Sequence, residues 1–172
     1  MADHVIRTAE AEDVGRLARL LQETYAFYGE KAPVAEDLLI ERLQRYLGAN
    51  PGFEALIAEQ DGRDLGYAIY APVFWTSDCQ LSLFLKELYL VEDARRCGIG
   101  RDFMVELASI ALERGWSRMI WTVDRHNHKA RRFYDSLEGT QALDKVVYLQ
   151  SDSVMKRLAT AGGSRFPYSF RV

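Results

Sequence analysis

Apolar side chains recur at intervals of three or four residues in four stretches of the chain, which is typical of amphipathic helices. In the first stretch, Val14, Leu17, Leu21 and Tyr25 follow one another at intervals of 3, 4 and 4 residues. Gly115 follows the third stretch directly and is a common helix stop. The predicted helices span Asp13 to Tyr28, Leu38 to Leu47, Ile99 to Arg114 and Lys129 to Leu137.

Short apolar runs between turn residues predict strands, and Asp61-Gly62 between two of the runs is typical of a hairpin turn. The element order is then β-α-α-β-β-β-α-β-α-β. That order predicts an α/β fold with a mixed central sheet flanked by helices. The predicted strands span Val5 to Thr8, Phe53 to Ala58, Leu65 to Phe74, Leu81 to Val91, Arg118 to Val123 and Val146 to Gln150.

The length of 172 residues fits one domain, which we place at residues 1–158. Residues 159–172 form a tail that begins with small residues and ends in an aromatic segment with Phe166, Tyr168 and Phe170. Small residues and glycines favour flexibility, whereas the aromatic rings favour docking. We therefore expect the tail to dock on a second subunit.

Hydrophobic residues make up 48% of the chain and charged residues 27%, as in ordinary globular proteins. The longest apolar run, Gly66 to Trp75, contains Pro72 and is about half as long as a membrane-spanning helix. The N-terminus carries acidic residues and no apolar core, unlike a secretory signal. Cys79 and Cys97 form no disulfide framework. We expect a cytoplasmic protein that does not enter membranes.

The charge is unevenly distributed. The net charge is −3, but residues 95–132 contain nine Lys or Arg and four Asp or Glu, which leaves −8 for the rest. A net acidic chain is poorly suited to nucleic acid, which attracts a basic stripe. A basic segment inside an acidic chain instead suggests one site for an anionic ligand, and the acidic remainder favours a cationic second ligand.

The chemistry of that anion site lies where the run Leu88-Tyr-Leu-Val leads into a turn and the next helix. Backbone N–H groups at such a turn and the helix dipole converge on one point, which suits a phosphate. Gly98 and Gly100 let a ligand approach the backbone closely. A P-loop is excluded because Gly100 is followed by Arg101 and Asp102, and a dinucleotide fingerprint lacks its third glycine at Phe103.

The turn Arg95-Arg-Cys-Gly-Ile-Gly100 resembles the Q/R-x-x-G-x-G/A signature of the GNAT superfamily of N-acetyltransferases. The resemblance extends to Glu87-Leu-Tyr-Leu before the turn, to Asn127-His-Lys-Ala-Arg-Arg-Phe-Tyr134 after it, and to the N-terminal segment. It spans residues 5–158 as an ordered set of motifs. Within the superfamily, the chain is most similar in look to the diamine (spermidine/spermine) acetyltransferases, through residues 85–90 and 118–134.

The resemblance implies a set of cofactor contacts. The pyrophosphate of acetyl-CoA would lie on the turn, and the pantetheine arm would pair with the preceding strand. Asn127 would hold the arm from the other side and cap the following helix, and Tyr134 would lie near the sulfur. The implied cofactor-binding residues are Leu88, Tyr89, Leu90, Arg95, Arg96, Cys97, Gly98, Ile99, Gly100, Arg101, Asn127 and Tyr134.

Two residues are the candidate catalytic groups. Aminolysis of a thioester needs a neutral amine and a proton for the leaving thiolate. A phenol with a pKa near 10 can supply that proton, which makes Tyr134 the candidate acid, and Glu87 can accept the proton of the amine directly or through water. The candidate acceptor residues are Tyr25, Tyr28, Glu30 and Glu87.

Each candidate has a plainer alternative. Arg95 and Arg96 could be solvated surface charges, Glu87 an exposed strand residue and Tyr134 a packing residue beside Phe133. His126 and His128 lack the further ligands of a metal site, so we expect no metal.

Three positions depart from the family pattern. The family often has Gly where Arg96 stands and an acidic residue where Lys86 stands. It usually has Gly four residues after the tyrosine, where this chain has Glu138. These differences concern the packing of the phosphate loop, the identity of the base and the end of the last helix.

Two functions follow from the sequence. The first is an acetyl-CoA-dependent N-acetyltransferase that acts on a small polyamine-like or amino-acid-derived amine, or on a protein amine. The second is an acyl-CoA-binding sensor or scaffold without turnover. Presence of both Tyr134 and Glu87 favours the enzyme. A homodimer is a common arrangement in this superfamily, and we expect one here.

Overall fold

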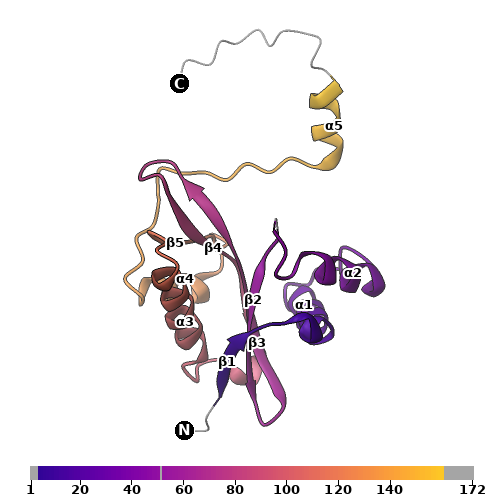
Figure 1. Ribbon diagram of the computed structural model, residues 1–172, viewed down its shortest axis with the longest axis vertical. Coiled ribbons are helices and arrows are strands. Elements are labelled where there is room, and N and C mark those ends of the chain that lie inside the picture. Colours follow the sequence, from indigo (N-terminus) through magenta and orange to yellow (C-terminus); the bar gives the residue numbers. More distant parts are fainter. Residues whose placement is uncertain (1–3, 51, 161–172) are drawn as a thin grey trace. The chain divides into compact units, whose positions relative to one another are not determined.

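The computed structural model of the protein describes residues 4–50 and 52–160. Its central sheet has the strand order β1-β2-β3-β4-β5 (Figure 1). Neighbouring strands from β1 to β4 are antiparallel, and β5 pairs with β4 in parallel. The predicted α/β fold with a mixed sheet is therefore confirmed. The strands are β1 (Val5–Thr8), β2 (Glu54–Gln60), β3 (Arg63–Trp75), β4 (Gln80–Leu90) and β5 (Met119–Trp121).

Helices cover both faces of this sheet. Helices α1 (Val14–Phe27) and α2 (Glu36–Tyr46) lie on one face, and α3 (Ile99–Glu113) lies on the other (Figure 1). On the α1 face, the hydroxyl of Tyr67 lies 2.9 Å from the Thr24 hydroxyl. Short 3-10 turns precede α1 (Ala11–Asp13) and follow β4 (Glu92–Ala94). The core on the α1 face is built from buried side chains that include Leu17, Leu20, Leu43, Ile57, Tyr67 and Tyr89.

The other face is fastened by a second tyrosine of β3. Tyr70 is fully buried, and its hydroxyl donates to Glu54 Oε2 at 3.1 Å. Arg114, at the end of α3, donates to the same carboxylate at 2.6 Å. Tyr67 and Tyr70 therefore point to opposite faces of β3, as the alternation of side chains requires for residues an odd number apart.

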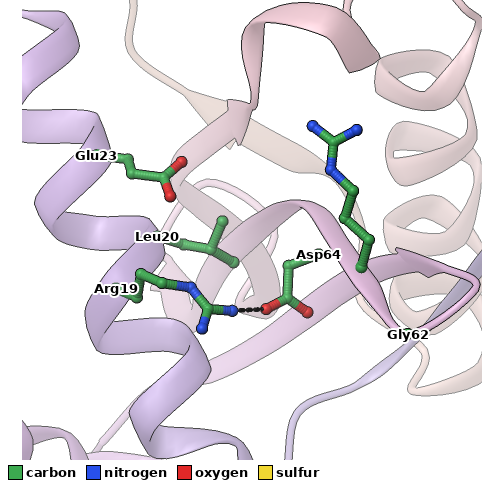
Figure 2. A pocket seen from close by; sticks show the side chains of 6 residues that line it. Arg19, Leu20, Glu23, Gly62 and Asp64 are labelled. Carbon is green, nitrogen blue, oxygen red and sulfur yellow. Dashed lines mark hydrogen bonds and ion pairs between the residues drawn. The ribbon is translucent and has the colours of Figure 1, made fainter.

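A cavity of about 360 Å³ lies between α1 and the β2–β3 turn (Figure 2). Arg19 in its wall pairs with the buried carboxylate of Asp64, and Arg63 pairs with Asp93 at 2.6 Å. Three of its charged side chains are thus engaged in ion pairs, which indicates a structural role. The cavity is lined by Arg19, Leu20, Glu23, Gly62, Arg63 and Asp64.

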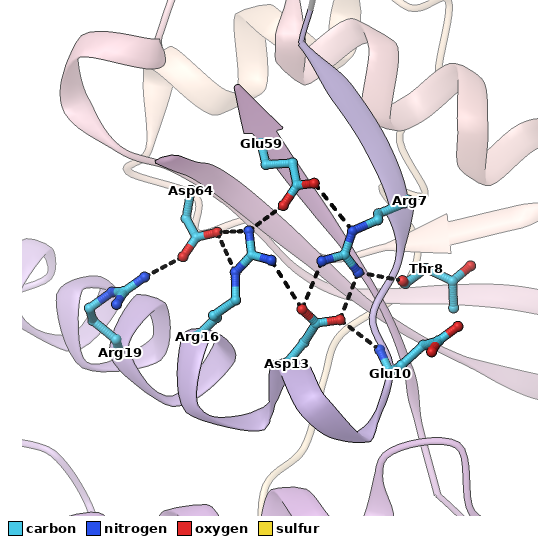
Figure 3. Close-up of polar contacts among 8 residues, drawn as sticks. All are labelled: Arg7, Thr8, Glu10, Asp13, Arg16, Arg19, Glu59 and Asp64. Atoms are coloured by element: carbon cyan, nitrogen blue, oxygen red, sulfur yellow. Dashed lines mark hydrogen bonds and ion pairs between the residues drawn. The ribbon is translucent and has the colours of Figure 1, made fainter. Parts of the chain in front are cut away.

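The same ion pairs continue into a network that joins β1, α1 and the β2–β3 hairpin (Figure 3). Asp13 accepts from both terminal nitrogens of Arg7, at 2.7 and 2.8 Å, and from the Glu10 N–H at 2.9 Å. Arg16 pairs with Asp13 and with the carboxylates of Glu59 and Asp64. The bidentate Arg7 contact lowers the pKa of Asp13 to about 2.

By its internal contacts the chain divides into two compact units, residues 1–124 and 125–172. The second unit contains α4 (His128–Asp135) and α5 (Asp152–Thr160). Helix α4 confirms the last helix predicted from the sequence, although it begins one residue earlier and ends two residues earlier. Helix α5 was not predicted; its Lys156 pairs with Asp152 one turn earlier at 2.7 Å. The domain boundary at residue 158 stays a prediction.

Two strand predictions need correction. Residues 146–150 form no strand: a strand needs a neighbour to satisfy its backbone groups, and no strand lies in the described part of the second unit. The strand predicted at Arg118 to Val123 is only the three-residue β5, because its ladder with β4 ends at Leu85. The aromatic tail of Phe166, Tyr168 and Phe170 lies outside the described residues. No helix in the described ranges is long and apolar enough to cross a membrane.

Candidate active site

The last residues of β4 have an open edge. The ladder to β5 ends where Leu85 pairs with Trp121, whereas the ladder to β3 continues to Leu90. The Val91 N–H donates to the Leu65 carbonyl at 3.0 Å, so the backbone groups of Tyr89 also face β3. By alternation, those of Leu88 and Leu90 point to the open side. An extended ligand with amide groups could pair there as a strand would.

A β-bulge at Lys86 separates the paired and open parts of β4. Ile69 pairs with Glu87 and Tyr70 pairs with Leu85, so Lys86 is one extra residue in the ladder. Leu85, opposite Tyr70, lies on the α3 face. Glu87 is opposite Ile69, which packs against the core on the α1 face. The bulge thus reverses the alternation and brings Glu87 to the α1 face.

Glu87 shares that face with the other three acceptor residues predicted from the sequence. Burial raises the pKa of the Glu87 carboxyl, the Lys86 ammonium lowers it, and the Glu30 carboxylate raises it further. Burial also raises the pKa values of Tyr25 and Tyr28, and the Glu87 charge adds to both shifts. The structure therefore brings Tyr25, Tyr28, Glu30 and Glu87 within electrostatic range of one another.

Sequence reasoning missed a fifth member of this group. Tyr67 is fully buried in β3, and the Glu87 charge contributes to its raised pKa after the larger effect of burial. The only signal for it in the sequence was its place in an apolar run. Whether Tyr67 and Glu87 lie on the same side of the sheet depends on the bulge, and the pattern of apolar and polar residues does not reveal a bulge.

The turn after β4 presents unpaired backbone donors. Gly98 caps α3 with a φ of 90°, and its carbonyl accepts from the N–H groups of Arg101 at 2.8 Å and Asp102 at 3.1 Å. The N–H groups of Gly98, Ile99 and Gly100 precede these first helical bonds, and no side chain in the described part of the chain caps them. Together with the helix dipole they suit an anion, and the missing Cβ of Gly98 leaves the approach open.

Arg95 and Arg96 take different positions at this turn. Arg96 is exposed and has a φ of 65°, in the left-handed region that favours glycine. Arg95 is half-buried, and its Nε donates to the Leu90 carbonyl at 2.8 Å. Glu138, the other charged residue at a position where the family has Gly, also has a positive φ, of 60°. Both departures from the family pattern thus occupy backbone conformations suited to glycine.

The second unit holds the remaining predicted residues. Asn127 caps α4 as expected: its Oδ1 accepts from the Ala130 N–H at 3.1 Å. Tyr134 lies in α4 with its ring centroid 5.1 Å from that of Phe133. The contact of Asn127 and Tyr134 with a cofactor stays a prediction. In the described ranges, no group of three or more His, Cys, Asp or Glu side chains is placed to hold a metal.

Comparison with known proteins identifies the family. The profile of the Acetyltransferase (GNAT) family matches residues 14–138. Thialysine N-epsilon-acetyltransferase from Sus scrofa is 29% identical over 80% of this chain and 84% of its own. The Mus musculus protein of that name is 30% identical over 83% of this chain and 87% of its own. An integron cassette protein from the mobile metagenome of V. cholerae has the same fold, with a TM-score of 0.82 and 24% identity over 92% of this chain and 99% of its own.

The open edge of β4 and the adjoining start of α3 fit an acyl-CoA-dependent transferase. The chain belongs to the GNAT family of acetyltransferases. It is an acetyl-CoA-dependent N-acetyltransferase, as its relatives are.

Proposed function

We propose that the protein acetylates a primary amine of a small, positively charged acceptor, polyamine-like or derived from an amino acid, by direct attack on the thioester of acetyl-CoA. The observation that carries this proposal is the position of Glu87, half-buried beside the open edge of β4, on the α1 face and within electrostatic range of Tyr25, Tyr28 and Glu30. Carboxylates among tyrosines attract an ammonium group and its alkyl stem. The name of the two thialysine acetyltransferases supports an amino-acid-derived acceptor.

The turn and the open strand edge are the parts that fit acetyl-CoA. The backbone N–H groups of residues 98–100 would hold the pyrophosphate, with Arg96 and Arg101 adding positive charge nearby. The backbone groups of Leu88 and Leu90 would pair with the amides of the pantetheine arm. When bound, acetyl-CoA supplies the activated acyl group, and these contacts fix its direction along β4.

Proton transfer falls to side chains of this chain. Glu87 accepts a proton from the acceptor ammonium or attacking amine, directly or through water, and its raised pKa makes it a stronger base than an exposed carboxylate. The amine nitrogen then forms the new bond to the acyl carbon, and the carbon–sulfur bond breaks. Tyr134 donates its phenolic proton to the leaving thiolate, and the proton that the nitrogen gives up as the amide forms restores the phenol through water.

Lys86 sets a limit on the acceptor. It is exposed next to Glu87, and its charge opposes the effect of burial on the Glu87 pKa. In this chain Lys86 takes the place where the family often has an acidic residue. We propose that it repels a second ammonium group at this end of the site, so the acceptor carries its other charge toward Glu30.

The test is to incubate the protein with acetyl-CoA and single amines and to measure released thiol. The amines are lysine, thialysine, spermidine, propylamine, which has no second charged group, and a peptide with a free N-terminus. We expect thiol release to be fastest with lysine, thialysine or spermidine. Thiol release with the peptide and with none of the small amines would contradict the proposal of a small acceptor. Calorimetric binding of acetyl-CoA with no release from any amine would instead support the non-catalytic sensor.

Location and assembly belong to the same proposal. The two cysteines, Cys79 and Cys97, are free thiols, which supports a reducing, cytoplasmic compartment. The aromatic residues after position 160 support a homodimer in which the tail docks on the partner. Light scattering on the full chain and on a chain ending at Thr160 tests this: loss of a dimer on truncation is expected, and a monomer in both cases would contradict it.

A further inference from the structure

We propose that Arg95 is a positioning residue that couples the acceptor end of α1 to the cofactor edge of β4, rather than a ligand of the cofactor phosphates. The inference rests on the proposed function for the roles of these two sites. Its structural basis is that one guanidinium contacts residues from both of them.

The first contact is on the cofactor side. The Arg95 Nε–H donates to the Leu90 carbonyl at 2.8 Å. Because the backbone groups of Leu90 point to the open side of β4, this carbonyl is the last acceptor along that edge. Arg95 takes up one of the two lone pairs of this carbonyl, at the point where the pairing of a bound strand-like ligand would end. The side chain thus sets the end of the open edge.

The second contact is on the acceptor side. The Arg95 guanidinium carbon lies 4.1 Å from the centroid of the Phe27 ring and 5.6 Å from that of Tyr89. Phe27 is the last residue of α1, and its ring packs edge-to-face with the Tyr28 ring at a centroid distance of 5.2 Å. A cation on a ring face at 4.1 Å is a favourable electrostatic contact. Arg95 therefore holds the residues that lead into the acceptor cluster.

Charge reaches the acceptor cluster as well. The positive charge of Arg95 opposes the pKa increase that burial and Glu87 produce at Tyr28. A guanidinium that stacks on a ring and donates to a carbonyl has a fixed plane. With its Nε–H on Leu90 and its plane on the Phe27 ring, Arg95 keeps only its terminal nitrogens for other partners, whereas the whole Arg96 side chain is exposed at the same turn. The geometry thus divides the two arginines between positioning and phosphate binding.

A double-mutant cycle with Arg95→Met and Phe27→Leu tests the coupling. With the best amine as acceptor, each single change should raise the acceptor KM about tenfold and change the calorimetric Kd of CoA less than about threefold. The double variant should also show about a tenfold increase, since both changes break one contact. Arg95→Lys, which keeps the charge without the planar fork, should recover little. Arg45→Met removes a similar contact over Tyr46 in α2 and is the matched control, with unchanged values expected.

Two results of the cycle would overturn the proposal. One is a CoA Kd raised tenfold or more by Arg95→Met with an unchanged acceptor KM. The other is a double variant whose increase in acceptor KM equals the product of the two single increases.

A second measurement needs no turnover. Hydrogen exchange of residues 24–30 is followed with and without CoA; the Glu30 N–H, bonded to the Tyr25 carbonyl at 2.9 Å, reports on this segment. CoA should slow exchange there in the wild type and not in Arg95→Met. Equal exchange with and without CoA in the wild type would refute the coupling, whatever amine is acetylated.

Discussion

The backbone of Gly66 lies against that of Tyr89: a Cβ on Gly66 would stand 2.2 Å from the Tyr89 carbonyl oxygen. Strands β3 and β4 approach this closely at the end of the open edge, where Gly66 pairs with Leu90. The contact requires glycine for lack of space and not for backbone conformation.

We therefore expect Gly66→Ala to force β3 and β4 apart, to destabilise the fold by about 1–3 kcal/mol and to weaken CoA binding. Urea denaturation and calorimetry measure the two effects. Gly15→Ala is the control, since a Cβ at Gly15 in α1 meets no atom within 4 Å and alanine favours a helix. If Gly66→Ala is as stable as Gly15→Ala, the close approach of the two strands is wrong.

Gly98→Asp tests the phosphate-binding turn. The new side chain would place a negative charge beside the donors at the start of α3, at a position whose φ of 90° already disfavours any side chain. CoA affinity should fall by several kcal/mol, since like-charge contact adds to lost hydrogen bonds. Gly62→Asp is the matched control: Gly62 also has a positive φ, of 75°, but lies in the β2–β3 turn. Unchanged CoA affinity in Gly98→Asp by calorimetry would rule this turn out.

Glu87→Gln should impair acetylation most at low pH. If Glu87 takes the amine proton, the loss of rate should shrink as the pH approaches the pKa of the amine, where neutral amine is already present. Rates of thiol release across a pH series measure this. A defect of constant size at every pH would show that Glu87 only binds the acceptor.

Glu87→Gln, which should impair acetylation, should stabilise the fold at neutral pH. Burial raises the pKa of Glu87, so the folded chain holds this proton more tightly than the unfolded chain. The ionised carboxylate therefore disfavours folding at neutral pH, and this cost is absent below the unfolded pKa of about 4.3. Thermal denaturation should find Glu87→Gln more stable than the wild type at pH 7, with no gain near pH 4.

Asp13→Asn should weaken the network at the start of α1. The Asp13 side chain is only 7% exposed and accepts bonds from Arg7, Arg16 and the Glu10 N–H. We expect a loss of about 2–4 kcal/mol in urea denaturation at pH 7. Asp144→Asn, which breaks the exposed pair with Lys145, is the control and should leave the midpoint unchanged.

The wild-type protein should lose the Asp13 contribution in acid. The folded pKa of Asp13 is about 2, below its ordinary value of 3.8. Its contribution is present above about pH 4 and disappears as the pH falls through 2, a change of about 2–3 kcal/mol. The pH dependence of stability in Asp13→Asn should lack this part. Parallel curves for the two proteins would contradict the ion pairs drawn in Figure 3.

Tyr134→Phe should lower kcat by about 10² to 10⁴-fold if the phenol protonates the leaving thiolate. The KM for acetyl-CoA should barely move, because a proton delivered in the transition state adds little to ground-state binding. Tyr46→Phe, at the end of α2, is the control that loses the same hydroxyl elsewhere. Wild-type kcat in Tyr134→Phe would make Tyr134 a packing residue.

The sequence predicted the elements whose burial follows a simple period. Val14 and Leu17 are buried as a helix of period 3.6 requires, Leu21 and Tyr25 of the same stripe are partly buried, and the strands up to β4 appear within two residues of their predicted ends. The strand prediction for residues 146–150 was wrong because an apolar run predicts burial but does not predict a partner strand. The turn at Gly98 was predictable, since glycine spacing is written in the sequence.

Contacts between distant elements were not predictable in the same way. Arg95 and Phe27 are 68 positions apart, and only the folded chain shows that the guanidinium lies on that ring. From its place in a phosphate-binding motif, a basic residue is expected to contact the phosphate. The contacts of its side chain in the folded chain are needed to assign it another role. The bulge at Lys86 was equally hidden, because one residue too many in a strand looks like ordinary strand sequence.

That bulge lets Leu85 and Glu87, two positions apart, lie on opposite faces of the sheet. Deleting Lys86 would remove no catalytic group and would make Leu85 and Glu87 direct neighbours, so plain alternation would keep Glu87 on the side of Tyr25 and Tyr28. The side on which the base lies is therefore set by the pairing of β4 with β3 and does not require residue 86 itself. In a set of homologous chains, a gap at position 86 in chains that keep the glutamate would be the evolutionary trace of this relationship.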